Sequence, residues 1–229
     1  MNHHPSFLNT NPGFHEDGRL YCQRDPLLAP NADTDLWNEH FQLKATVSGA
    51  VNGSYLQPNP TAYSGSERVV YLRDNQSKAV WGASHETYDR SAEDFAFVAS
   101  PNEIVWETRQ DGIRTRRSLM VPWDDPVEHW TITVSNDSQV RRHLSVFPVF
   151  GLGFLGLLDH RASYDKEAQG ILCRLFRYYV KIEDYYPLSK QRNLSYCLAS
   201  TAPDSWECSL EAFAGPGGLG SPRALKAQR

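Results

Sequence analysis

Apolar and polar residues alternate along short stretches of the chain, which is the pattern of strands with one buried face. The alternation is regular over residues 40–47, where apolar side chains recur at every second position before Gly49. The stretch 68–72 is rich in β-branched and aromatic residues, which favour strands. Both stretches are predicted to be strands, separated by an Asn/Pro/Gly-rich loop over 52–66.

The strongest local signal is a hairpin in the middle of the chain. Residues 103–110 and 113–121 are joined by Asp111-Gly112, a dipeptide that adopts the positive φ angles of a type I′ turn. We expect the apolar side chains of the two arms to face inward and the Arg and Thr side chains to form a wet face. The inward residues are Ile104, Trp106, Ile113 and Leu119.

Residues 127–135 alternate in the same way and predict another strand. A turn at 136–138 and an apolar return over 142–150 indicate a second antiparallel hairpin. From 151 to 169 the pattern is mostly that of a loop, and strand character resumes in three stretches, 170–182, 194–199 and 208–213. Because strands recur at short intervals and no amphipathic helix of three turns is evident, the predicted fold class is all-β, a sandwich or barrel.

The tail, residues 215–229, is rich in Gly and Pro and then basic, which is typical of a linker. We therefore divide the chain into a sandwich domain over 1–214 and the start of a linker over 215–229. A chain that stops where a linker would lead to another domain is expected to be a fragment.

Composition narrows the function classes. The 229 residues carry a formal net charge of -4 with only short arginine groups, so nucleic acid is not an expected partner. The N-terminus lacks a basic segment followed by an apolar one, and no apolar run is long enough to span a membrane, so neither secretion nor a membrane is expected. The four widely spaced cysteines indicate free thiols in a reducing compartment, and the predicted location is the cytoplasm.

Candidate catalytic motifs are weak. Asp124-Asp125 with Glu128 lie in a Pro-flanked turn, and Glu183-Asp184 lie at a strand end, although paired carboxylates are what glycosidic chemistry needs. The chain holds no GxSxG elbow, HExxH or Walker motif and no GxGxxG in the required context, and its eight His residues lack ligand spacing. No catalytic residue, metal site or cofactor is therefore assigned.

Aromatic residues are the remaining signal, because exposed Trp and Tyr rings can stack on sugars. Trp106 and Trp130 lie on apolar faces and are assigned to the core. Ligand contact stays open for four aromatic residues in loops or at strand ends, which are Trp37, Trp81, Tyr88 and Trp123.

A longer motif combines a Tyr-x-Arg-Asp strand, a later Trp, a VPxDDxVE segment, and TxxNxS and RxLS elements. In this chain its residues are Tyr71, Arg73, Asp74, Trp81, Ile113, Val121, Pro122, Asp124, Asp125, Val127, Glu128, Thr133, Asn136, Ser138, Arg142, Leu144 and Ser145. In order and spacing the motif resembles the N-terminal domain of glycoside hydrolase family 94, formerly glycosyltransferase family 36.

The resemblance implies an antiparallel β-supersandwich of the galactose mutarotase-like kind, truncated before a helical linker and an (α/α)6 barrel that would carry the catalytic Asp. The family includes cellobiose and chitobiose phosphorylases and cyclic β-1,2-glucan synthases. It implies inverting phosphorolysis of β-glucosides, with inorganic phosphate as co-substrate. A Gln-Arg pair that reaches the acceptor sugar in the family matches His160-Arg161 by position. Together with the aromatic candidates, the predicted substrate-binding residues are Arg161, His160, Trp81 and Trp123.

The predicted function is a carbohydrate-binding domain of a glycoside phosphorylase or glycosyltransferase acting on β-glucans or β-linked disaccharides, non-catalytic alone. Carbohydrate is the expected partner, a homodimer stays open, and so does whether the chain is itself an enzyme. One alternative is an aldose 1-epimerase-like enzyme on the same sandwich, which needs a Glu base and a His acid in one cleft. Glu128 and His129 are adjacent on one predicted strand and point to opposite faces. Another alternative is a structural dimerisation module without sugar affinity.

Overall fold

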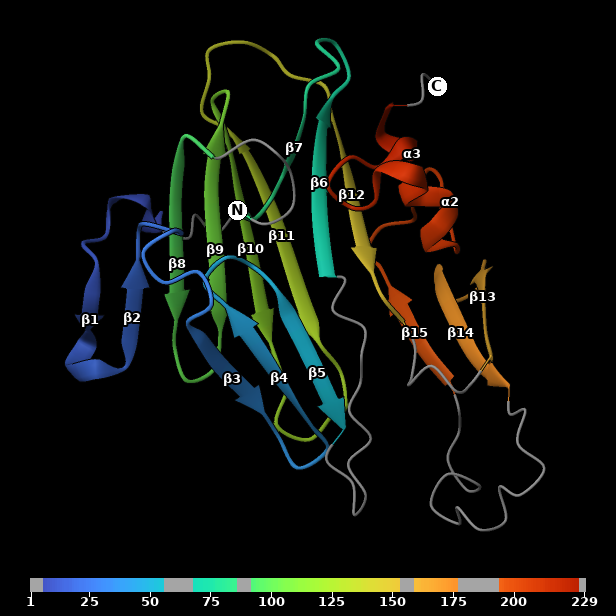
Figure 1. The fold of residues 1–229 in the computed structure, drawn as a ribbon, viewed down its shortest axis with the longest axis horizontal. Helices are drawn as coiled ribbons and strands as arrows, with labels where there is room; N and C mark the ends of the chain where they lie inside the picture. The colour runs from blue at the N-terminus through green and yellow to red at the C-terminus, as the bar shows by residue number, and fades with distance from the viewer. Residues whose placement is uncertain (1–5, 56–67, 86–91, 153–158, 177–193, 227–229) are drawn as a thin grey trace.

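The computed structural model describes residues 6–55, 68–85, 92–152, 159–176 and 194–226. These residues form four antiparallel sheets with a few short helical segments (Figure 1). The predicted all-β class is confirmed. No helix within the described ranges is long and apolar enough to cross a membrane.

One sheet has six strands and the other three have three strands each. The six-stranded sheet consists, in spatial order, of β1 (Gly13–His15), β2 (Leu20–Gln23), β8 (Asp94–Ala99), β9 (Ile104–Gln110), β10 (Ile113–Met120) and β11 (His129–Asn136). The β3-β4-β5 sheet consists of β3 (Asp33–Trp37), β4 (Phe41–Thr46) and β5 (Val51–Tyr55). The β12-β6-β7 sheet consists of β12 (Leu144–Phe150), β6 (Arg68–Asp74) and β7 (Val80–Gly82). The β13-β14-β15 sheet consists of β13 (Asp159–Asp165), β14 (Gly170–Phe176) and β15 (Leu194–Leu198).

The hairpin of β9 and β10 forms as predicted. Asp111 and Gly112 have φ angles of 49° and 72°, the left-handed values that a type I′ turn requires. Gln110 pairs directly with Ile113 across the turn. The Asp-Gly dipeptide therefore fixes the register of β9 and β10.

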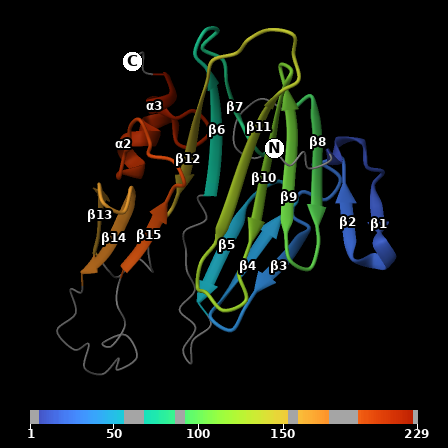
Figure 2. The ribbon, with the colours of Figure 1, turned by 180° about the vertical axis from the view of Figure 1, so that it is seen from behind.

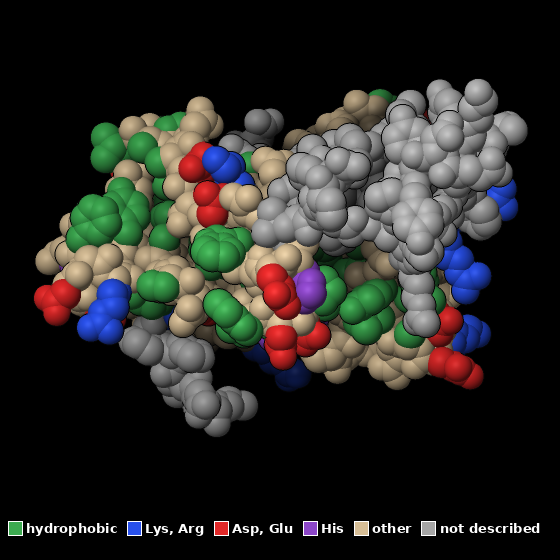
Figure 3. All heavy atoms as spheres, turned by 90° about the horizontal axis from the view of Figure 1, so that it is seen from below, with side chains coloured by type: hydrophobic (Ala, Val, Ile, Leu, Met, Phe, Trp, Pro, Cys, Tyr) green, Lys and Arg blue, Asp and Glu red, His purple; other side chains and the backbone are tan. Residues whose placement is uncertain are grey.

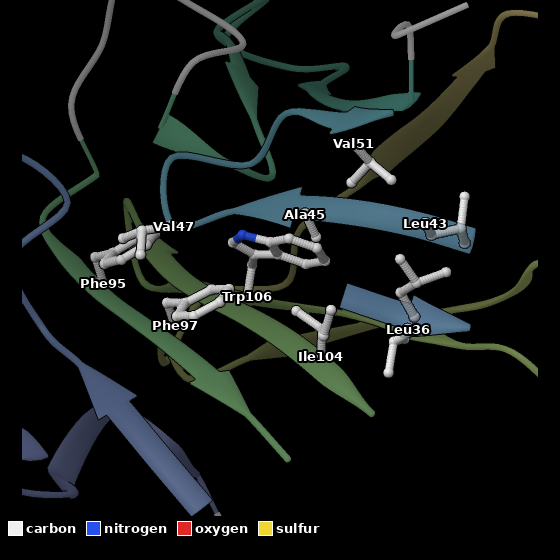
Figure 4. Close-up of a cluster of buried hydrophobic side chains, with 10 residues drawn as sticks. Leu36, Leu43, Ala45, Val47, Val51, Phe95, Phe97, Ile104 and Trp106 are labelled. Atoms are coloured by element: carbon white, nitrogen blue, oxygen red, sulfur yellow. The ribbon is translucent and has the colours of Figure 1, made fainter. Parts of the chain in front are cut away.

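Trp106 on β9 is the centre of the largest hydrophobic cluster, between the six-stranded sheet and the β3-β4-β5 sheet (Figure 4). Its ring is fully buried, and its Nε1 donates a hydrogen bond to the carbonyl oxygen of Thr46 at 3.0 Å. The alternating side chains predicted for 40–47 supply the other half of this cluster, which includes Leu43, Ala45 and Val47 together with Trp106. The assignment of Trp106 to the core is confirmed.

A second cluster joins the β12-β6-β7 sheet to the same face of the six-stranded sheet. Val70, Leu72 and Trp81 pack there against Ile113 on β10. Ile113 and Leu119 are on one face of β10 because alternate residues of a strand point the same way. The β3-β4-β5 and β12-β6-β7 sheets therefore lie side by side over one face of the six-stranded sheet.

The wet face predicted for the hairpin is wrong in part. Arg117 pairs directly with Trp106, and Thr115 pairs with Thr108, so these side chains share the inward face. All four residues are buried. The prediction separated residues by polarity, whereas the register of the two-residue turn alternates the side chains strictly by position.

The second predicted hairpin does not form, although both of its strands do. β11 pairs with β10 in the six-stranded sheet, whereas β12 pairs with β6 in another sheet. The connection between them is held in place just before β12. There Arg142 donates hydrogen bonds to the Asp74 carboxylate at the end of β6 and to the carbonyl oxygen of Asp111. These contacts between distant segments carry the chain from one sheet to the next.

The end of the chain contains short helices. The strand predicted at 208–213 is helix α2 (Leu210–Ala214) instead, and Ser209 caps its first turn by accepting a hydrogen bond from the backbone of Ala212. Residues 215–226, expected to begin a linker, form the turn η5 (Gly215–Gly217) and helix α3 (Arg223–Lys226). Phe213 and Leu225 pack against Tyr71 of β6, whose hydroxyl donates to the carbonyl oxygen of Leu219.

The β13-β14-β15 sheet lies beyond the β12-β6-β7 sheet, on the side away from β1 and β2, as the front and back views both show (Figure 1 and Figure 2). Residues 159–165 were predicted to be mostly loop but form β13. The prediction for 170–182 is confirmed over 170–176, and the remainder is outside the described residues. The strand predicted at 194–199 is β15.

Candidate functional site

Two arginine side chains stand directly opposite each other on the β13-β14-β15 sheet. Arg161 of β13 pairs with Arg174 of β14, and both side chains are exposed. The pattern over 151–169 predicted a loop at Arg161, whereas the structure places it on an edge strand. His160 precedes it on β13 and pairs with Leu175, but its side chain is outside the described part.

An apolar strip borders this arginine pair on the same face of the sheet. Arg174 pairs with Leu194, and Leu172 pairs with Tyr196, so their side chains share the face of Arg161. Tyr196 is 49% exposed. The face therefore offers two guanidinium groups beside an exposed phenol ring, groups that suit a ligand with a negative charge and an apolar side.

Arg174 and Tyr196 were missed by the sequence analysis. Arg174 becomes a neighbour of Arg161 only if residues 159–165 pair with β14. The turn between β13 and β14 carries a sequence signal for this pairing, because Asp165 accepts hydrogen bonds from the backbone of Glu167 and Ala168. An Asx turn of this kind followed by Gly170 indicates a hairpin.

The opposite face of the same sheet is covered by the segment that follows β15. Tyr164 of β13 stacks on Trp206, with ring centroids 4.0 Å apart and an interplanar angle of 14°. Burial is the largest cause of the raised pKa of Cys173 on this sheet, and likewise of Cys197 and Cys208. Thiols with raised pKa values are protonated at neutral pH and are poor nucleophiles, so this face favours packing over chemistry. All four cysteines are free.

Of the predicted aromatic contacts, Trp81 is wrong and Trp123 stays a candidate. Trp81 is only 2% exposed, because the β12-β6-β7 sheet closes over it against Ile113. Its ring has no face left for a sugar. Trp123 is 82% exposed in the loop between β10 and β11, and Trp37 is 65% exposed at the end of β3. Tyr88 is outside the described residues.

The carboxylates that resemble a catalytic pair have structural surroundings. Glu128 forms an ion pair with the buried Arg68, with 2.6 Å between Nε and Oε2, and accepts a hydrogen bond from Trp130 Nε1 at 2.9 Å. Asp124 and Asp125 are exposed in the preceding loop. Glu183-Asp184 lie outside the described residues. The structural interpretation of Glu128 is therefore favoured over an acid or base role.

Arg117 lies at the junction of the six-stranded, β3-β4-β5 and β12-β6-β7 sheets. Its guanidinium donates from Nη1 to the carbonyl oxygen of Arg68 at 2.8 Å and from Nη2 to that of Gly49 at 3.0 Å. It also lies over the rings of Trp106 and Trp130, at 4.2 Å and 5.2 Å from their centroids. Gly49 has a φ of 116°, and a Cβ there would lie 2.5 Å from the Cβ of Ser84, so only glycine fits.

The fold defines this chain as an antiparallel β-supersandwich domain. The family model described as Glycosyl hydrolase 94, supersandwich domain, matches residues 59–229, which is more than half of the chain. The chain belongs to glycoside hydrolase family 94, as its motif predicted.

Three curated relatives are phosphorylases. Cellobionic acid phosphorylase of Neurospora crassa is 29% identical over 230 residues, covering 92% of this chain and 29% of the relative. 3-O-β-D-glucopyranosyl-β-D-glucuronide phosphorylase of Paenibacillus borealis is 23% identical over 202 residues, covering 88% of this chain and 26% of the relative. N,N'-diacetylchitobiose phosphorylase of Vibrio proteolyticus is 21% identical over 161 residues, covering 69% of this chain and 20% of the relative. The chain spans less than a third of the length of each of these relatives.

Proposed function

We propose that this chain is the carbohydrate-binding N-terminal domain of a glycoside phosphorylase and that it contributes substrate contacts without being catalytic alone. Membership of the family and the exposed Arg161–Arg174 pair support the proposal. In the reaction that the family implies, an acid protonates the glycosidic oxygen as its bond to the anomeric carbon breaks. Phosphate oxygen forms the new bond to that carbon with inversion. The part of this domain is to hold the acceptor-side sugar in place.

The arginine pair further favours an acceptor sugar that carries a carboxylate. A guanidinium binds a carboxylate through two parallel hydrogen bonds, which selects an acid over a neutral sugar. Two of the relatives are named for acidic sugars, cellobionic acid and a glucuronide. The apolar strip of Leu172 and Tyr196 beside the two arginines suits the less polar side of the sugar ring.

The test is isothermal titration of the 229-residue chain with cellobionic acid and, separately, with neutral cellobiose. We expect cellobionic acid to bind more tightly, and Arg161→Ala and Arg174→Ala each to weaken it by roughly tenfold or more, the loss of one charge-assisted contact. Lys166→Ala removes an exposed positive charge at the end of β13 and serves as the matched control, with unchanged affinity. Equal affinities for the two sugars would contradict the acidic acceptor.

The two alternatives predict other readouts. An aldose 1-epimerase-like enzyme would accelerate mutarotation of free glucose. The Glu base of such an enzyme would have to be Glu128, whose carboxylate already accepts hydrogen bonds from Arg68 and Trp130. A structural dimerisation module would show no sugar affinity in the titration. Release of a sugar phosphate by this chain in the presence of phosphate would contradict the proposal that it is non-catalytic alone.

The cellular setting is part of the same proposal. We place the domain in the cytoplasm, with carbohydrate as its ligand and a homodimer as its assembly. The free cysteines support a reducing compartment. Sedimentation of the purified chain tests the dimer, and expression with fractionation tests the location.

A further inference from the structure

Two tryptophan rings are exposed at one end of the sandwich, apart from the β13-β14-β15 sheet. Trp37 ends β3, and Trp123 lies in the loop that joins β10 to β11. Both loops lie at the lower end of the molecule in Figure 1. Burying a large apolar side chain stabilises the folded state by about 1.5–3 kcal/mol, and neither exposed tryptophan contributes this stabilisation. Contiguous exposed apolar surface rimmed by polar residues marks an interaction site.

A buried amide holds the two tryptophan segments together. Asn38 is 1% exposed, and its Nδ2 donates to the carbonyl oxygens of Pro122 at 2.7 Å and Asp125 at 2.8 Å. Trp37 directly precedes Asn38, and Trp123 directly follows Pro122. By the reach of these bonds the Cα atoms of the two tryptophans are no more than about 13 Å apart. The rings are therefore carried on preorganised neighbouring segments, which lowers the entropic cost of binding.

Polar groups lie next to both tryptophans. On the outer face of the β3-β4-β5 sheet, Trp37 pairs with Gln42 and Asp35 pairs with Lys44. Exposed Asp124 and Asp125 follow Trp123. The view from this end shows apolar side chains beside a group of acidic ones (Figure 3). Carboxylate and amide groups accept and donate hydrogen bonds to sugar hydroxyls, while the rings can stack on the sugar faces.

We propose that Trp37 and Trp123 form a second carbohydrate site, which binds a neutral β-glucan chain independently of the arginine pair. The acidic side chains disfavour an anionic glycan, in contrast to the surface around Arg174. They also disfavour a protein partner, because the buried centre of a protein interface is depleted in Asp and Glu. The site goes beyond the proposed acceptor contact, and it would hold a longer glycan on the domain.

The test is titration of the 229-residue chain with cellopentaose, followed by calorimetry and by tryptophan fluorescence. We expect Trp37→Ala and Trp123→Ala each to weaken binding by roughly tenfold, and the double variant to abolish it. Phe14→Ala is the matched control, because Phe14 is an aromatic residue that is 74% exposed on β1, and it should leave the affinity unchanged. Arg174→Ala should also leave cellopentaose binding unchanged, which separates this site from the acidic acceptor.

Circular dichroism on every variant shows that it is folded, and the exposed positions of both tryptophans make folding of the variants the expected result. Cellopentaose affinities of folded Trp37→Ala and Trp123→Ala equal to that of the unaltered chain would overturn the proposal. It would also be overturned if the folded unaltered chain bound no cellopentaose, or if the two substitutions dissociated an oligomer without affecting sugar binding.

Discussion

Arg117 and Arg174 occupy comparable places in two different sheets. Each lies on a strand with a neighbour on both sides, Arg117 on β10 and Arg174 on β14. Arg117 is fully buried, whereas Arg174 is exposed. The same side chain therefore meets two very different surroundings in one domain.

The difference lies in what the neighbouring strands present. Opposite Arg117 are Trp106 and Ile132, and the carbonyl oxygens of two other sheets accept its hydrogen bonds. Opposite Arg174 is a second arginine, Arg161, and like charges directly opposite on neighbouring strands are unfavourable. We infer that the first arginine serves folding and the second serves a ligand. The predictions below test that contrast, from the largest expected effect to the smallest.

Arg117→Ala is expected to have the largest effect. It leaves two buried carbonyl oxygens without their donors and opens a cavity beside Trp106 and Trp130, so the free energy of unfolding should fall by about 4 kcal/mol or more. Urea denaturation measures the change. Arg117→Lys is the matched control and should recover only part of the loss, because an ammonium group cannot span both acceptors as a planar guanidinium does. A loss below about 1 kcal/mol for Arg117→Ala would contradict its role at the junction.

Glu128→Ala is expected to cost slightly less. Arg68 is 6% exposed, and removal of its carboxylate partner leaves a nearly buried positive charge uncompensated, a loss of about 3 kcal/mol. Glu128→Gln keeps an acceptor for Arg68 and Trp130 and should cost less. The same denaturation assay compares the two. Equal losses for both variants would show that the lost charge accounts for the whole effect and that the acceptor retained by Gln contributes nothing.

Asp74 gives the pH dependence of the junction between β6 and the connection to β12. Burial, the largest single influence, raises its pKa, but hydrogen bonds from Gln76, Ser77 and Arg142 together outweigh it and lower the pKa. A lowered folded-state pKa adds stability that is present above the unfolded value of about 3.9 and is lost as the pH falls through the folded value.

We therefore expect the free energy of unfolding to decrease below about pH 4. Asp74→Asn should flatten this decrease, because an amide does not titrate, and should reduce stability at neutral pH by about 1–2 kcal/mol. Denaturation curves between acidic and neutral pH measure both effects. The exposed Asp124→Asn removes a carboxylate outside this junction and serves as the control. An unaltered acid limb in Asp74→Asn would assign the pH dependence to other carboxylates.

Local signals allowed the sequence to predict the strands but not their assembly. The Asp111-Gly112 turn determines its own hairpin, and the prediction is confirmed. The turn at 136–138 looks equally local, yet β11 and β12 enter different sheets because Arg142 and Asp74 hold the connection across a distance of 68 residues. Pairing between remote segments leaves no local periodicity in a single sequence.

The site was predictable to a similar degree. Arg161 and Trp123 followed from a motif and from loop position, and both side chains are exposed. Trp81 was misplaced because β7 has three residues, too few for alternation to reveal which face is buried. Arg174 was missed, since its relation to Arg161 exists only once β13 and β14 pair, and only the Asx turn at Asp165 indicates that pairing.

Arg174→Ala should have the smallest effect on stability and so completes the contrast with Arg117. The substitution removes one of two like charges that are directly opposite, which is worth about 0.2–1 kcal/mol in favour of the variant. The gain should shrink as salt is added, because exposed charges are screened. Urea denaturation at low and high salt, with Lys166→Ala as the control, measures it. A loss of several kcal/mol would mean that Arg174, like Arg117, is needed for folding. A variant that is as stable as the unaltered chain but binds cellobionic acid weakly would assign Arg174 to the ligand.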